Sequence, residues 1–73
     1  VGPRVMILID AKKRAAYVAE KQGDWETARN ALRHYPNNWR VREAALNSGK
    51  MYYACINKSM HKALANDLNI LMG

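Results

Sequence analysis

The segment that most constrains the fold is residues 21–38, KQGDWETARNALRHYPNN, which combines two helix-breaking positions with a helical apolar repeat. Gly23 can close a helix in the left-handed conformation, and Asp24 can cap the helix that follows. Pro36 stops that second helix, and one of the two asparagines after it can cap another. Apolar side chains with the spacing of one helix face lie between these breaks, at Trp25, Ala28, Leu32 and Tyr35. The segment therefore predicts the centre of a helical hairpin.

The sequence QGDWETA at residues 22–28, followed by PNN at residues 36–38, resembles the middle of a tetratricopeptide repeat. The resemblance covers about one hairpin. Pro36 comes too early for the second helix of such a repeat, and the pattern does not recur elsewhere in the chain. A solenoid also needs about three units to bury its faces. We therefore interpret the likeness as shared hairpin chemistry.

Four helices are predicted along the chain. The first runs from about Ile7 or Asp10 to Gln22, the second covers residues 25–34, and the third opens near Trp39 and ends at a break over residues 47–49. A longer amphipathic helix follows from residue 50. Its apolar face is formed by Tyr52, Ile56, Met60, Ala63, Ile70 and Leu71. The fold class is therefore an all-α, single-domain bundle over residues 1–73, with residues 1–5 expected to be disordered or foreign to the natural protein.

A chain of 73 residues can build only a thin core, because it buries about 60% of the surface that its unfolded form exposes. The chain contains no Phe, so Trp25, Trp39 and the tyrosines are expected to anchor that core. Dimerisation through the C-terminal helix would supplement it. One cysteine, no long apolar run and no recognisable leader segment favour a soluble, cytoplasmic protein.

The residues of catalysis and metal binding are sparse. One Cys and two His at wide spacing predict no metal site, and the six carboxylates are too scattered for paired acid-base chemistry. The four glycines never assemble into a phosphate-binding loop. We therefore predict that the protein is not an enzyme and holds no cofactor.

The formal net charge of +6 favours a polyanionic partner, although positive charge can also serve only solubility. Residues 43–51 resemble a helix-turn-helix, because Gly49 stands four residues after Ala45 at the expected turn. The side chains that would then project from a recognition helix are Lys50, Tyr53, Asn57 and Lys58.

Nucleic acid could also be bound without that motif, by charge alone. The cations expected to converge on one surface for this purpose are Arg29, Arg33, Arg40, Lys58 and Lys62. The resulting hypothesis is a non-enzymatic regulatory or accessory protein that binds nucleic acid, with DNA favoured over RNA. The alternative is a helical module that inhibits or adapts an acidic protein partner, with Trp39, Tyr35 and the C-terminal apolar face as anchors.

Overall fold

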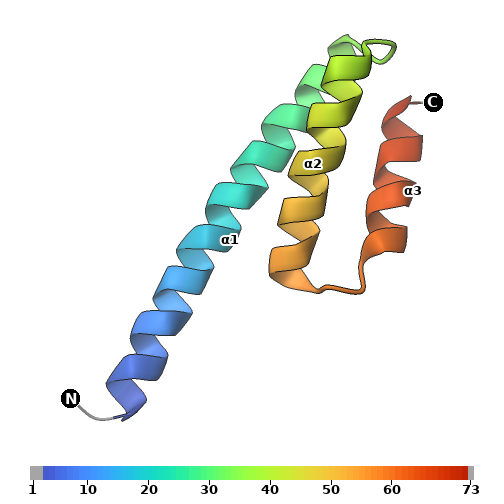
Figure 1. Ribbon diagram of the computed structural model, residues 1–73. Coiled ribbons are helices and arrows are strands. Elements are labelled where there is room, and N and C mark those ends of the chain that lie inside the picture. The colour runs from blue at the N-terminus through green and yellow to red at the C-terminus, as the bar shows by residue number, and fades with distance from the viewer. Residues whose placement is uncertain (1–2, 73) are drawn as a thin grey trace.

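The computed structural model describes the backbone of residues 3–72 and the side chains of residues 10–72. In this range the chain forms three helices and no strand: α1 (Pro3–His34), α2 (Trp39–Ile56) and α3 (His61–Met72). α2 turns back along the C-terminal half of α1, and α3 turns back along α2 (Figure 1). The N-terminal part of α1 extends beyond the other helices, so the molecule measures 52 × 21 × 14 Å. The all-helical class is confirmed, but the chain has three helices and not four.

The break predicted at Gly23 is wrong, because α1 continues straight through it. A glycine inside a helix costs only about 1 kcal/mol, which local contacts can offset. Here Trp25, two residues further along, anchors this part of α1 in the core, and Lys21 Nζ lies 3.7 Å from an Asp24 carboxylate oxygen one turn along. The two predicted helices are therefore one rod, and the hairpin that resembled a tetratricopeptide repeat does not form.

The break predicted at residues 47–49 is also wrong, because α2 includes all three residues. Gly49 is buried, and both Trp25 and Leu64 pack against it. A Cβ atom at this position would lie 2.9 Å from Trp25 Cζ3 and would overlap Leu64 Cδ1. This glycine therefore allows three helices to approach closely and does not make a turn.

The stop predicted at Pro36 is confirmed. α1 ends at His34, and Asn38 takes an extended conformation (φ −83°, ψ 113°) as the cap of α2. Asn38 Oδ1 accepts hydrogen bonds from the backbone N–H groups of Arg40 (3.0 Å) and Val41 (3.4 Å). Such a cap stabilises a helix by about 1 kcal/mol, so local chemistry alone defines this turn.

The second turn was not predicted, because residues 50–72 showed one apolar stripe. Asn57 ends α2 in an extended conformation (φ −160°, ψ 125°), and its side-chain oxygen accepts from Ser59 N (3.1 Å) and Ser59 Oγ (2.9 Å). Asparagine favours such turns because its side chain competes with the helix for backbone donors. The predicted stripe is therefore split, and two of its members are exposed: Ile56 by 44% and Ile70 by 71%.

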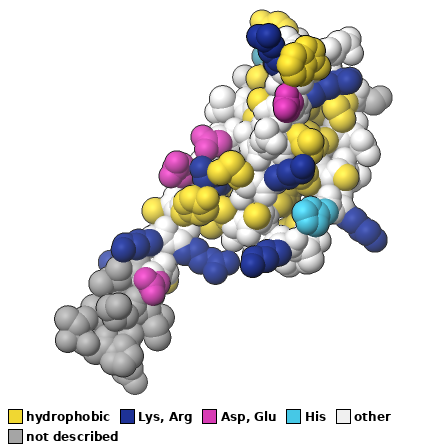
Figure 2. All heavy atoms as spheres, in the orientation of Figure 1, with side chains coloured by type: hydrophobic (Ala, Val, Ile, Leu, Met, Phe, Trp, Pro, Cys, Tyr) yellow, Lys and Arg dark blue, Asp and Glu magenta, His cyan; other side chains and the backbone are white. Residues whose placement is uncertain are grey.

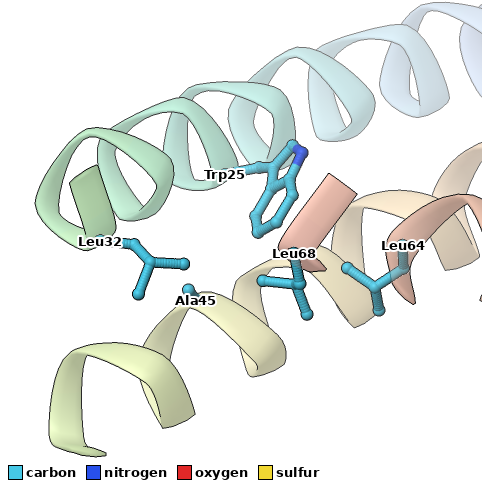
Figure 3. Packing of buried hydrophobic residues seen from close by; sticks show 5 residues of the cluster. All are labelled: Trp25, Leu32, Ala45, Leu64 and Leu68. Carbon is cyan, nitrogen blue, oxygen red and sulfur yellow. The ribbon is translucent and has the colours of Figure 1, made fainter. Parts of the chain in front are cut away.

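The core lies where the three helices meet. Its buried side chains are Trp25, Leu32, Ala45, Leu64 and Leu68 (Figure 3). Trp25 is 1% exposed and extends from α1 toward the other two helices, where its ring meets Tyr53 edge-on with centroids 6.2 Å apart. The prediction that Trp39 anchors the core is wrong, because that side chain is 66% exposed.

Two expectations about the ends and the environment of the chain can be compared with the structure. Residues 3–5, which were expected to be disordered or foreign, begin α1, whereas residues 1–2 lie outside the described part. Of the helices described, none is both long and apolar enough to cross a membrane. The cytoplasmic location stays a prediction.

Candidate nucleic-acid interface

Basic side chains gather where the bundle makes its α2–α3 turn. Lys50, Lys58 and His61 line one small cavity, and Lys58 also lines the neighbouring groove between α1 and α2, together with Arg14. Lys62 follows His61 in the first turn of α3 and is exposed. We call this set the basic end: Arg14, Lys50, Lys58, His61 and Lys62. Figure 2 shows dark blue Lys and Arg side chains along the lower edge of the visible face, and no carboxylate lines either cavity.

Arg14 joins the basic end through a contact that spans 41 positions of sequence. Its Nη2 atom donates a hydrogen bond to the Cys55 carbonyl at 3.3 Å. The last carbonyls of a helix have no partner within the helix, and cations are favoured beside them. Arg14 was not predicted as a site residue. It directly follows two lysines, and no local feature of the sequence distinguishes it from them.

In the part of the chain that the structure describes, the lysines and the arginine of the basic end have no carboxylate partner within ion-pair distance. Among residues 10–72, the only Lys or Arg within 4.0 Å of a carboxylate oxygen is Lys21, which lies near Glu20 (3.9 Å) and Asp24 (3.7 Å). The cations of the basic end therefore form no direct ion pair with a carboxylate of this region.

The four residues predicted on a recognition helix, Lys50, Tyr53, Asn57 and Lys58, all line the small cavity at the α2–α3 turn. The helix-turn-helix frame is wrong, because α2 has no turn at Gly49. Lys50, Asn57 and Lys58 are exposed there, and Asn57 also caps the end of α2. Tyr53 is half-buried and packs against the core. Only the two lysines are therefore placed to meet a partner by charge.

Tyr53 has a structural role between α2 and α3. Its hydroxyl donates a hydrogen bond to the Asp67 carboxylate, so the polar residue that interrupts the apolar stripe of α3 has a partner inside the bundle. Burial, followed by the hydrogen bond to Asp67 and the negative charge of Asp67, raises the pKa of Tyr53 to about 12. The neutral hydroxyl is therefore the form that the folded protein stabilises.

Tyr53→Phe is expected to lower the free energy of unfolding by about 1–2 kcal/mol at neutral pH, because the Asp67 carboxylate loses a donor. The folded-state pKa of Tyr53, about 12, lies above the ordinary value of a tyrosine, 10.0. The contribution of the hydroxyl is therefore fully present below pH 10 and is lost as the pH rises toward 12. Urea denaturation across this pH range should show the wild-type advantage shrinking.

Tyr52→Phe provides the matched control, because Tyr52 is the neighbouring half-buried tyrosine of α2. The free energy of unfolding of Tyr52→Phe should be close to that of the wild type at neutral pH, and it should fall between pH 10 and 12 as that of the wild type does. A constant difference between Tyr53→Phe and the wild type over that range would contradict the role assigned to the hydroxyl.

The predicted convergence of five cations on one surface is wrong. Arg40 stands at the first turn of α2 and Lys58 just beyond its last turn, so the rise of a helix separates them by roughly 25 Å. Arg29 and Arg33 line a third cavity, with Asp67 and Ile70, and the Arg29 guanidinium carbon lies 5.4 Å from the centroid of the Trp25 ring. The cations thus divide between the two ends of the bundle.

The groove beside the basic end has a mainly apolar lining and a volume of about 470 Å³. It lies between α1 and α2, and its lining residues are Arg14, Tyr17, Val18, Met51, Ala54, Cys55 and Lys58. Cys55 is a half-buried free thiol. The groove therefore offers an apolar floor between two cations.

Among the described residues, no three His, Cys, Asp or Glu side chains are placed to share a metal ion. Comparisons of the chain with protein-family models, with curated proteins and with solved structures gave no match. Function is therefore inferred from the surface that the helices present.

Proposed function

We propose that this chain is a non-enzymatic protein that binds nucleic acid through phosphate contacts at the basic end. One observation carries the proposal: Arg14, Lys50 and Lys58 surround two adjoining cavities that no carboxylate lines. Phosphates are recognised by such clusters because each contact releases a condensed counterion. The net charge of +6 adds attraction at longer range. DNA is the favoured partner.

The double variant Lys50→Gln/Lys58→Gln tests the basic end. It should weaken binding to a mixed-sequence DNA duplex, and the slope of log affinity against log salt should become shallower by about two, since two phosphate contacts are removed. Fluorescence anisotropy of a labelled duplex between about 50 and 200 mM salt measures both quantities; several phosphate contacts lose orders of magnitude over this range.

The matched control is Lys12→Gln/Lys13→Gln, which removes the same charge from exposed positions of α1. It should reduce affinity much less than the variant in the basic end. Equal losses in the two variants would show that net charge alone attracts DNA and that the basic end is not a binding site. No binding by the wild type at low salt would overturn the proposal altogether.

A second candidate function is interaction with an acidic protein, and the groove between α1 and α2 favours it. An amphipathic helix could place apolar side chains on Val18, Met51 and Ala54 while its carboxylates meet Arg14 and Lys58. Ala54→Arg would fill the groove without removing a cation. This candidate predicts that Ala54→Arg abolishes capture of an acidic amphipathic peptide, whereas the phosphate proposal predicts unchanged or stronger DNA binding.

Dimerisation through α3 stays a prediction.

A further inference from the structure

A second cationic surface lies at the opposite end of the bundle, around the α1–α2 turn. We call it the aromatic-arginine end, and its members are Arg33, Tyr35, Trp39, Arg40 and Arg42. Tyr35 is 62% exposed and Trp39 is 66% exposed. Figure 2 shows hydrophobic side chains beside dark blue ones at this upper end of the molecule. Two large aromatic side chains that project into water from one turn are a feature that the core does not explain.

The turn holds these aromatic residues in place. The Asn38 backbone N–H donates to the Tyr35 carbonyl at 3.2 Å, and Arg42 Nε donates to the Pro36 carbonyl at 2.6 Å. Trp39 follows directly as the first residue of α2. Both aromatic residues therefore flank a short turn whose backbone is held by one hydrogen bond within the turn and one from α2. Because the backbone is already ordered, less conformational entropy is lost when a ligand binds.

The electrostatics of this end favour an anion. Residues 33–42 contain three arginines and no carboxylate, and the one carboxylate that follows directly, Glu43, leaves the positive charge in excess. The Arg40 guanidinium carbon lies 5.4 Å from the centroid of the Trp39 ring, so the two groups form a cation-π pair. A planar guanidinium beside an indole offers an extended flat surface together with a charge.

We infer that the aromatic-arginine end binds single-stranded nucleic acid, with bases stacking on Trp39 and Tyr35 and phosphates facing the arginines. This inference rests on the proposed function and specifies a form of nucleic acid for it. Every unpaired base has a π-face that can stack on an aromatic ring, whereas the bases of a duplex are already stacked on one another. Exposed rings with neighbouring arginines therefore select single strands.

A protein partner fits this end less well. Hot spots of protein interfaces also favour Trp, Tyr and Arg, but they lie in well-packed pockets inside a larger patch that excludes water. Here the two rings alternate with arginines, asparagines and a proline within ten residues. That composition suits a ligand that carries flat rings and negative charges together.

The test is the affinity of the full chain for a labelled oligothymidylate, which has no duplex structure, compared with a labelled duplex. Trp39→Ala should weaken oligothymidylate binding by about 5- to 160-fold, the equivalent of the 1–3 kcal/mol that base stacking on an aromatic side chain contributes. Its duplex affinity should stay near that of the wild type. Oligothymidylate should also quench tryptophan emission in the wild type, because Trp39 is accessible and Trp25 is buried.

Ile56→Ala is the matched control, because Ile56 is also an exposed apolar side chain, by 44%, but lies at the opposite end of α2 from Trp39. It should leave oligothymidylate affinity almost unchanged. Equal affinities of Trp39→Ala and the wild type for oligothymidylate would overturn the inference, while salt-sensitive duplex binding would leave the proposed function standing. If the wild type binds neither nucleic acid but polyglutamate quenches Trp39, both proposals are wrong and the acidic ligand is a polypeptide.

Discussion

Trp25→Ala is expected to remove most of the stability of the bundle. Trp25 is 1% exposed, contacts the ring of Tyr53 and covers the buried Gly49, so its loss opens a cavity between all three helices. Removing a buried tryptophan costs about 3–5 kcal/mol. A chain of this length has roughly 4–11 kcal/mol of total stability. Urea denaturation followed by far-ultraviolet circular dichroism should show a transition shifted close to zero denaturant.

The natural control for that variant is Trp39→Ala, which removes the same side chain from a site that is 66% exposed. It should change the free energy of unfolding by no more than about 0.5 kcal/mol, as surface substitutions usually do. Similar destabilisation by both substitutions would mean that the two tryptophans share the core, contrary to the packing in Figure 3.

The two helical glycines should respond in opposite directions to alanine. Gly49→Ala places a methyl group 2.9 Å from Trp25 Cζ3 and into the space of Leu64 Cδ1, so the core must shift. Such overpacking costs about 1–3 kcal/mol, which exceeds the gain in helix propensity. At Gly23 an added Cβ meets nothing within 4 Å, so Gly23→Ala should stabilise α1 by about 0.5–1 kcal/mol.

Thermal denaturation can resolve this pair, because 1 kcal/mol moves the midpoint of a domain of this size by about 4–8 °C. The Gly49→Ala midpoint should fall and the Gly23→Ala midpoint should rise. A rise in both would show that Leu64 and Trp25 move aside easily. A fall in both would indicate that the chain bends at Gly23 in solution.

Local chemistry explains which parts of the fold could be predicted. The turn at Pro36 was predictable because proline and a capping asparagine act on the backbone of their own segment. The two glycines were not, since a glycine favours a turn and a close helix contact equally well, and only tertiary packing decides between them. The turn at Asn57 carried a local signal, Asn-Lys-Ser, which the apolar stripe on either side concealed.

The candidate site was predictable in part for the same reason. Lys50 and Lys58 were singled out from a motif whose turn is absent, yet both are exposed, Lys50 on α2 and Lys58 in the turn that follows α2. Arg14 joins them only through a contact with the far end of α2. Trp39 does not belong to the apolar repeat of α1. It is exposed because it is the first residue of α2 and lies outside the apolar stripe that faces Trp25.

The near absence of ion pairs has a consequence for how this protein responds to its medium. Among residues 10–72, only Lys21 lies within 4.0 Å of carboxylates, so most of the excess positive charge repels itself within one small bundle. Added salt screens that repulsion and stabilises the folded chain, whereas it weakens any attraction to a polyanion. Stability and binding therefore change in opposite directions with ionic strength, and a ligand lost at high salt leaves behind a protein that is more firmly folded than before.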